Sequence, residues 1–128
     1  MNYLLDAHSI LWYTLNDDRL PVQQYRNIED SSNQIFISYV SIWEIGIKNS
    51  IGKLKIEKSF ESFVKEKLEP YNFIFLSIQL SHVIEATSLP FHHRDPFDRM
   101  LIAQSKIENI PVISSDSVFD KYGVTRVW

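Results

Sequence analysis

The chain alternates short apolar runs with helical segments, and this alternation constrains the fold more than any other feature. Five apolar runs of strand length span residues 3–5, 35–37, 73–76, 111–114 and 125–128. Helical patterns lie between them, over residues 9–15, 21–30, 41–51, 59–68, 81–87, 95–108 and, as a single turn, 117–121. Strands that are short and apolar throughout are buried on both faces, as in a parallel sheet covered by helices. The sequence therefore predicts an α/β fold.

Length and composition indicate one globular domain. The 128 residues are enough to bury a core, and no repeat, low-complexity run or long linker divides them. We therefore expect a single domain over residues 1–128. Cysteine is absent, which excludes disulfides, zinc–thiolate sites and thiol nucleophiles. No apolar run approaches the ~20 residues of a membrane span, and no basic stretch precedes the first strand, so we expect a cytoplasmic protein without membrane contact.

The net charge of −3 does not suggest a protein that coats nucleic acid through bulk charge. It leaves a nuclease open, because bound cations can supply positive charge where a phosphate lies. Four lysines, Lys48, Lys53, Lys55 and Lys58, form either a basic edge for RNA or simply a solvated helix end and loop.

Two aspartates follow predicted strands directly. Asp6 comes after the run that ends at Leu5, and Asp116 after the run that ends at Ser114. In open α/β sheets ligands bind at the carboxyl ends of strands, near the point where strand order reverses. That position favours a ligand-binding role for both aspartates. The alternative is that each is the N-cap of the helical segment that follows it.

Glu44 interrupts an otherwise apolar helix. On a helical wheel it shares a narrow polar stripe with Ser41 and Lys48, and apolar residues cover most of the remaining circumference. A carboxylate so enclosed is costly unless it has a partner. The two interpretations are a metal ligand and an i,i+4 ion pair with Lys48.

Two more aspartates open the helix predicted over residues 95–108. Asp95 directly precedes Pro96, which is typical of an N-cap followed by proline at the first helical position. Asp98 lies in the first turn, where its alternative role is interaction with the helix dipole. We therefore expect Asp98 to be the better metal ligand and Asp95 mainly a cap that could also reach a metal.

Brought together, these acids would repel each other unless a divalent cation neutralised them, and oxygen-only ligation suits Mg²⁺ or Mn²⁺. Ser114 could offer a hydroxyl to metal or substrate. The four histidines show no zinc spacing, and we expect each to be a surface or core residue. The alternative for His92 and His93, which lie next to Arg94, is contact with a phosphate. Nucleotide-binding glycine loops and a serine nucleophile elbow are both absent. The acids therefore predict a hard-metal site and phosphoryl chemistry.

Several segments resemble PIN domains, and the likeness spans nearly the whole chain. The matching segments are residues 4–12 (LLDAHSILW), 41–48 (SIWEIGIK) with 52–54, 89–104 with its HHRDPFDR stretch, 113–116 (ISSD) and 122–124. The HHRDPFDR stretch is the most specific of them and is similar to VapC-type toxins of bacterial toxin–antitoxin pairs. One departure is Ala7, where the family often has threonine; Ser9 is a partial substitute for the missing hydroxyl.

The resemblance implies a three-layer α/β/α fold with a five-stranded parallel sheet in the order 3-2-1-4-5. It also implies a magnesium- or manganese-dependent endoribonuclease, usually a homodimer, that a cognate antitoxin silences. The acidic set carried over is Asp6, Glu44, Asp98 and Asp116, with Asp95 close by. These carboxylates would hold one or two ions that activate water for attack on an RNA phosphodiester, and Arg99 would neutralise charge on the phosphate.

Other functions stay open at this stage. A phosphoacceptor receiver domain is also small, α/β and magnesium-binding, but it needs an acceptor aspartate after the middle strand, where this chain has Leu76-Ser77. A second alternative is a PIN-like module that binds metal or RNA without a toxin role.

Overall fold

The computed structural model describes residues 1–128. Its centre is one five-stranded sheet made of β1 (Asn2–Leu5), β2 (Gln34–Ser38), β3 (Phe73–Leu76), β4 (Val112–Ile113) and β5 (Arg126–Val127). All strand pairs are parallel, and the order is β3-β2-β1-β4-β5. The predicted α/β class and the strand order implied by the resemblance are both confirmed.

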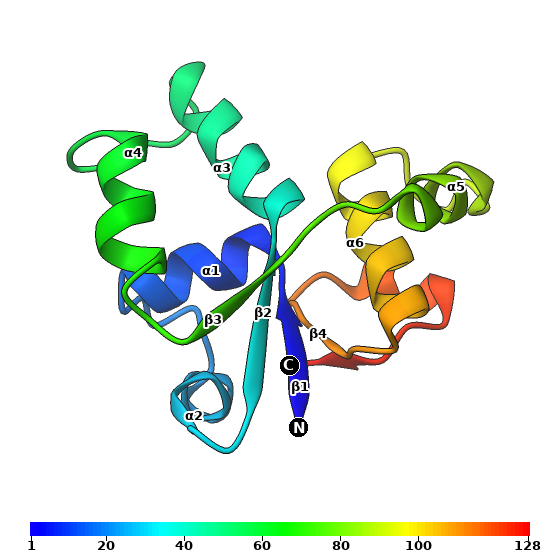
Figure 1. Cartoon of the computed structure of the whole chain (residues 1–128), viewed down its shortest axis with the longest axis horizontal. Coiled ribbons are helices and arrows are strands. Elements are labelled where there is room, and N and C mark those ends of the chain that lie inside the picture. The colour runs from blue at the N-terminus through cyan, green and yellow to red at the C-terminus, as the bar shows by residue number, and fades with distance from the viewer.

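Helices connect successive strands, as a parallel sheet requires. They are α1 (Ala7–Thr14), α2 (Val22–Glu29), α3 (Tyr39–Ser50), α4 (Phe60–Phe63), the π-helical η1 (Val64–Leu68), α5 (Leu80–Ser88), α6 (Pro96–Glu108) and the 3₁₀ segment η2 (Ser117–Tyr122). In Figure 1, α1, α2 and α4 lie on one side of the sheet and α5 and α6 on the other. None of the helices combines the length and apolar composition needed to cross a membrane.

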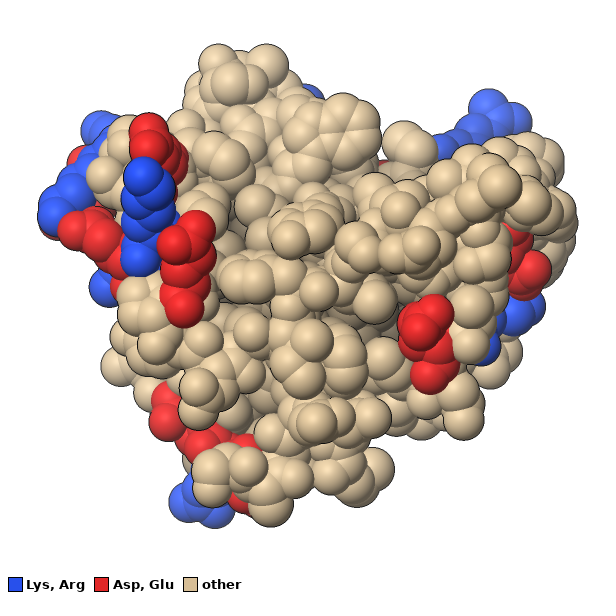
Figure 2. Space-filling model, viewed as in Figure 1, with Lys and Arg blue, Asp and Glu red and all other residues tan.

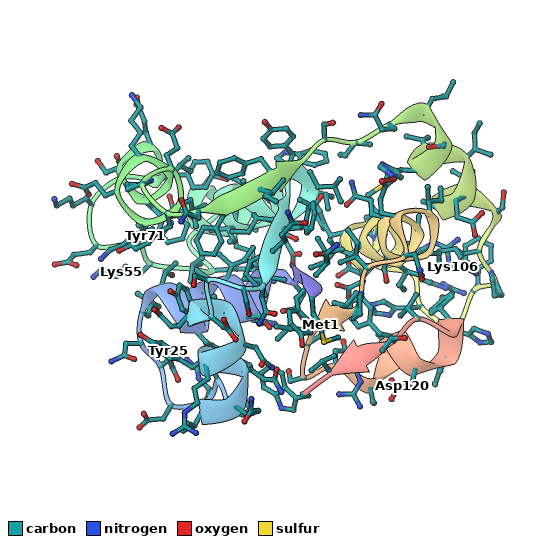
Figure 3. All side chains as sticks on the ribbon, turned by 60° about the horizontal axis from the view of Figure 1, so that its bottom comes forward. Met1, Tyr25, Lys55, Tyr71, Lys106 and Asp120 are labelled. Atoms are coloured by element: carbon teal, nitrogen blue, oxygen red, sulfur yellow. The ribbon has the colours of Figure 1, made fainter.

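Alternate residues of β1 face the two sides, and this divides the core into two clusters. Tyr3 and Leu5 pack with α1 and α3 residues such as Ile10 and Ile45. Leu4 points the other way, into a cluster that includes Leu101 of α6. Figure 3 shows side chains filling the space between the sheet and the helices on both sides, while Lys55, Lys106 and Asp120 lie at the periphery. Both faces of the sheet are therefore buried, as the continuous apolar strands predicted.

Most predicted elements differ from the observed ones by one or two residues at their ends, and the segment predicted as a single helix over residues 59–68 differs in type. It begins as predicted, with the Ser59 hydroxyl accepting a hydrogen bond from the Ser62 N–H at 3.1 Å. From Val64 it continues as a π-helix, in which the Glu69 N–H donates to the Val64 carbonyl at 3.0 Å. The segment still packs on the first cluster through Phe63 and Leu68, which are both buried, while residues 65–67 of the wider turn are exposed.

The strand order shows where the predicted functional edge of the sheet lies. β1 is flanked by β2 on one side and by β4 on the other, with Leu5 opposite both Ile37 and Ile113. The strand order therefore reverses between β1 and β4, since β2 and β3 are added on one side of β1 and β4 and β5 on the other. Because all these strands are parallel, the residues that follow β1 and β4 emerge at the same edge of the sheet.

Candidate functional site

Asp6 and Asp116 meet at this edge through Ser114. The Ser114 hydroxyl donates to Asp6 Oδ2 at 2.6 Å and accepts from the Asp116 N–H at 3.0 Å. Asp6 Oδ1 also accepts from the Ser9 N–H at 2.9 Å, and Asp116 Oδ1 accepts from the Val118 N–H at 3.0 Å. Both aspartates are thus helix caps, as one interpretation predicted. Each carboxylate oxygen still has lone pairs for a second partner.

Ser114 is fully buried, and its hydroxyl is engaged by these two bonds. Its observed role is to fix the orientation of Asp6 relative to Asp116, not to present a free hydroxyl to a substrate. The Ser9 hydroxyl donates to the Ile113 carbonyl at 2.9 Å and fastens the start of α1 to β4. Ser9 therefore does not replace the hydroxyl that Ala7 lacks.

The start of α6 brings a second pair of acids to the same place. Asp95 Oδ1 accepts from the N–H groups of Phe97 and Asp98, at 2.8 and 3.3 Å, so its predicted cap is confirmed. The Asp98 side chain takes no part in this cap. Its Oδ2 lies 2.8 Å from His93 Nε2. One donor atom each from His93, Asp98 and Asp116 lies within 4.8 Å of the others. Residues far apart in sequence thus form a compact set of ligand atoms.

Glu44 reaches the site from α3. Its predicted ion pair with Lys48 is present at 2.8 Å, with 9% of the Glu44 side chain exposed against 37% of the Lys48 side chain. Glu44 is also near enough to Asp98 for its charge to raise the pKa of that carboxyl. The ion pair and the ligand hypothesis are compatible, because each carboxylate oxygen has lone pairs for more than one partner.

Asp98 is the acid of this cluster whose pKa is clearly shifted, and burial is the main cause. Burial, with a smaller contribution from the charges of Asp95 and Glu44, raises the pKa of Asp98 to about 6, and the hydrogen bond from His93 opposes the shift. The ionised form of this carboxyl is therefore less favourable than that of a free aspartate, and a bound cation would offset that cost. Carboxylate oxygens and one imidazole are a suitable donor set for a small divalent cation, so the residues present fit a metal site.

The structure gives Arg99 a different role from the predicted contact with phosphate. Only 7% of Arg99 is exposed, and its guanidinium donates to four backbone carbonyls, those of Ala86, Leu89, Pro90 and His93. The distances lie between 2.9 and 3.2 Å. These bonds use both terminal nitrogens to hold the loop between α5 and α6. The prediction failed because sequence places Arg99 beside Asp98 but does not show which side of the helix is buried.

His93 is the site residue that the sequence analysis missed. It precedes α6 by three residues and has no helical periodicity to place its side chain. A signal was present nonetheless, since it lies within five residues of Asp98 and in the most specific stretch of the chain. Only the folded loop shows that its imidazole points at the acids and that His92 instead lies against the Tyr122 ring.

A groove on a different part of the surface does not include the acids. That groove has a volume of about 420 Å³ and lies between α1, the connector over residues 54–58 and the helical segment that follows. Its lining residues are Leu11, Leu15, Leu54, Lys55, Ile56, Glu57, Lys58, Phe63, Glu66 and Lys67. We place the functional site at the acids, because they combine charge, a position at the strand-order reversal and, for Asp6 and Glu44, burial.

Comparison with known proteins identifies relatives of this fold. The PIN domain family model matches residues 3–124. No curated protein sequence matches the chain. Among solved structures, VapBC2 from Rickettsia felis bound to a promoter DNA fragment has a TM-score of 0.75 at 15% identity, with 99% of this chain and 98% of that chain covered. DNA-bound VapBC from Salmonella typhimurium has a TM-score of 0.72 at 14% identity, covering 100% and 97%. FitAcB from Neisseria gonorrhoeae has a TM-score of 0.69 at 15% identity, covering 98% and 96%.

Proposed function

The chain belongs to the PIN domain family, and from this we propose that it is a divalent-metal-dependent endoribonuclease that acts as the toxin of a toxin–antitoxin pair. PIN domains are nucleases and generally use divalent metal ions. The observation that supports the proposal is the compact set of ligand atoms from His93, Asp98 and Asp116, with Asp6 joined to Asp116 through Ser114 and Glu44 near enough to act on the charge of Asp98. Mg²⁺ or Mn²⁺ is the proposed cofactor, since the site is rich in carboxylate oxygens.

These residues divide the work of the site. Asp6, Asp98 and Asp116 would hold the cation, and Glu44 would join them from α3. When bound, the ion supplies positive charge for the phosphate and activates water for hydrolysis of the phosphodiester. Ser114 keeps Asp6 in place, Lys48 keeps Glu44 in place, and Asp95 fixes the first turn from which Asp98 projects. This rigid support matters because catalytic groups must be positioned before substrate arrives.

The partner we propose is an antitoxin protein. The structural relatives are described as VapBC and FitAB assemblies, which supports a partner chain for this one. An anionic pocket is a natural receptor for a guanidinium group, which can pair with carboxylates in a bidentate manner. We therefore propose that the antitoxin inhibits by placing an arginine among the acids.

We also propose that the chain forms a homodimer through the face that carries β3 and α5. Figure 2 shows the middle of this face without lysine, arginine, aspartate or glutamate. Large apolar side chains are exposed on its elements: Leu80 is 75% exposed, Ile84 59% and Ile74 38%. Extended apolar surface of this kind is typical of an interface between subunits. Leu80→Glu should convert a dimer to a monomer in sedimentation analysis without unfolding the chain, and an unchanged mass would refute this choice of face.

The test of the enzymatic proposal is cleavage of a set of RNA oligonucleotides by the purified chain. We expect cleavage with Mg²⁺ or Mn²⁺ and none in EDTA. Cleavage that persists undiminished in EDTA would refute metal dependence. Metal binding and RNA binding without cleavage would instead favour the alternative of a PIN-like binding module. Growth arrest on expression, relieved by the product of a neighbouring small gene, would support the toxin role.

A further inference from the structure

A nitrogen donor lies among the carboxylates of the proposed metal site. His93 Nε2, an oxygen of Asp98 and an oxygen of Asp116 all lie within 4.8 Å of one another. The other three histidines have different surroundings. His8 stacks on Trp12, His82 is buried against Glu108, and His92 contacts the Tyr122 ring. His93 is therefore the one imidazole directed at the acids.

The backbone of His93 is held on both sides. Its N–H donates to the Tyr122 hydroxyl at 2.8 Å, and its carbonyl accepts from the Arg99 guanidinium at 3.2 Å. Tyr122 also donates to the Pro90 carbonyl at 2.8 Å, so the same hydroxyl and the same guanidinium bind both ends of the loop. The buried side chains of Tyr122 and Arg99 thus fix the backbone of this loop. The fixed loop places the His93 imidazole beside Asp98. A surface histidine needs no such support.

His93 Nε2 and Asp98 Oδ2 have the spacing of adjacent ligands of one ion. For metal–ligand bonds of about 2.1 Å in an octahedral site, adjacent ligands lie about 3 Å apart and opposite ones about 4.2 Å apart. His93 Nε2 and Asp98 Oδ2 are 2.8 Å apart, and Asp116 completes a set within 4.8 Å. A hydrogen bond joins His93 Nε2 to Asp98 Oδ2. The same two atoms, at nearly the same spacing, could both bind one cation.

We propose that His93 is itself a ligand of the divalent cation, which makes this a mixed imidazole–carboxylate site that prefers a transition-metal ion over Mg²⁺. The inference rests on the proposed metal-dependent function and specifies its ligand set. Mg²⁺ favours oxygen ligands and gives up its waters reluctantly, whereas imidazole nitrogen is a good ligand for first-row transition metals. The alternative is that His93 stays outside the ligand set and only orients Asp98 through a hydrogen bond.

The experiment uses the full chain and Mn²⁺ as the probe, with electron spin echo spectroscopy of the bound ion. A directly coordinated nitrogen modulates the Mn²⁺ echo, and we expect this ¹⁴N signal in the parent protein. It should be lost in His93→Gln and kept in His92→Gln, the matched control for an adjacent exposed histidine. Calorimetry should show Mn²⁺ affinity falling by about tenfold or more in His93→Gln and Mg²⁺ affinity falling less.

The spectrum is the decisive readout, because losing a hydrogen bond from outside the ligand set can also weaken metal affinity by about tenfold. Mn²⁺ bound in the parent without nitrogen modulation would overturn the inference and leave the proposed metal-dependent nuclease intact. Modulation that survives His93→Gln would overturn it as well. Absence of Mn²⁺ binding in the parent would refute both this inference and the metal dependence. The parent spectrum gives its answer even where the variant fails to fold.

Discussion

Neutralising Asp98 should stabilise the metal-free protein at alkaline pH and leave it unchanged at acid pH. Burial of this carboxyl raises its pKa from 3.8 to about 6. The folded state therefore binds the proton more tightly than the unfolded state does. The favourable contribution of the protonated carboxyl is complete below about pH 4 and is lost as the pH rises through about 6. The Asp98→Asn side chain resembles the protonated carboxyl at every pH. The variant should therefore keep the stability that the parent loses as the pH rises.

The size of the effect follows from the same pKa. Each pH unit between 3.8 and about 6 corresponds to about 1.4 kcal/mol, which sets a ceiling of about 3 kcal/mol. The Asp98 side chain is 20% exposed, so water and salt screen part of its charge. We therefore expect Asp98→Asn to gain about 1–2 kcal/mol at pH 8 relative to pH 4. For a chain of 128 residues, this is a rise of roughly 4–8 °C in Tm.

Thermal and urea unfolding of parent and variant in EDTA, from pH 4 to pH 8, measures the difference directly. Asp17→Asn is the control with the opposite sign, because the hydrogen bond from Arg19 lowers the pKa of Asp17 to about 2. That variant should lose stability at neutral pH. The reasoning about burial and like charge would be refuted if the difference in unfolding free energy between parent and Asp98→Asn stayed constant from pH 4 to pH 8. It would also be refuted if the parent were the more stable protein at pH 8.

Three further predictions concern neighbouring residues. Glu44→Gln should abolish metal-dependent cleavage of RNA with the circular dichroism spectrum unchanged, and near-normal turnover would leave Glu44 only as the partner of Lys48. Asp95→Asn should change Tm little and Asp95→Ala should cost about 1 kcal/mol, since asparagine also caps a helix; equal losses would argue against the cap. Arg99→Met should cost roughly 2–4 kcal/mol in urea unfolding, because it leaves buried carbonyls unpaired, and a variant as stable as the parent would show that these bonds contribute nothing.

The sequence by itself determined the fold class and most element positions. Continuous apolar runs such as residues 73–76 require burial on both faces, and helical segments between them leave a parallel sheet as the solution. The caps at Asp6, Asp95 and Asp116 were also predictable, because a cap depends on a few adjacent residues. The strand order came from the resemblance to PIN domains, since local pattern does not specify which strands pair.

Only the tertiary structure decided how the candidate site is assembled. The bond from Ser114 to Asp6 joins residues 108 positions apart, and its existence depends on β1 and β4 being neighbours. Tertiary packing also decided the roles of Arg99 and His93. The sequence analysis gave a site role to Arg99 and no ligand role to His93, and the structure places His93 at the acids instead. Arg99 lies beside Asp98 in sequence but is turned into the loop, and His93 lies outside the helix but points at the acids. Local sequence fixes backbone conformation and caps, whereas the direction of a loop side chain depends on packing between elements distant in the chain.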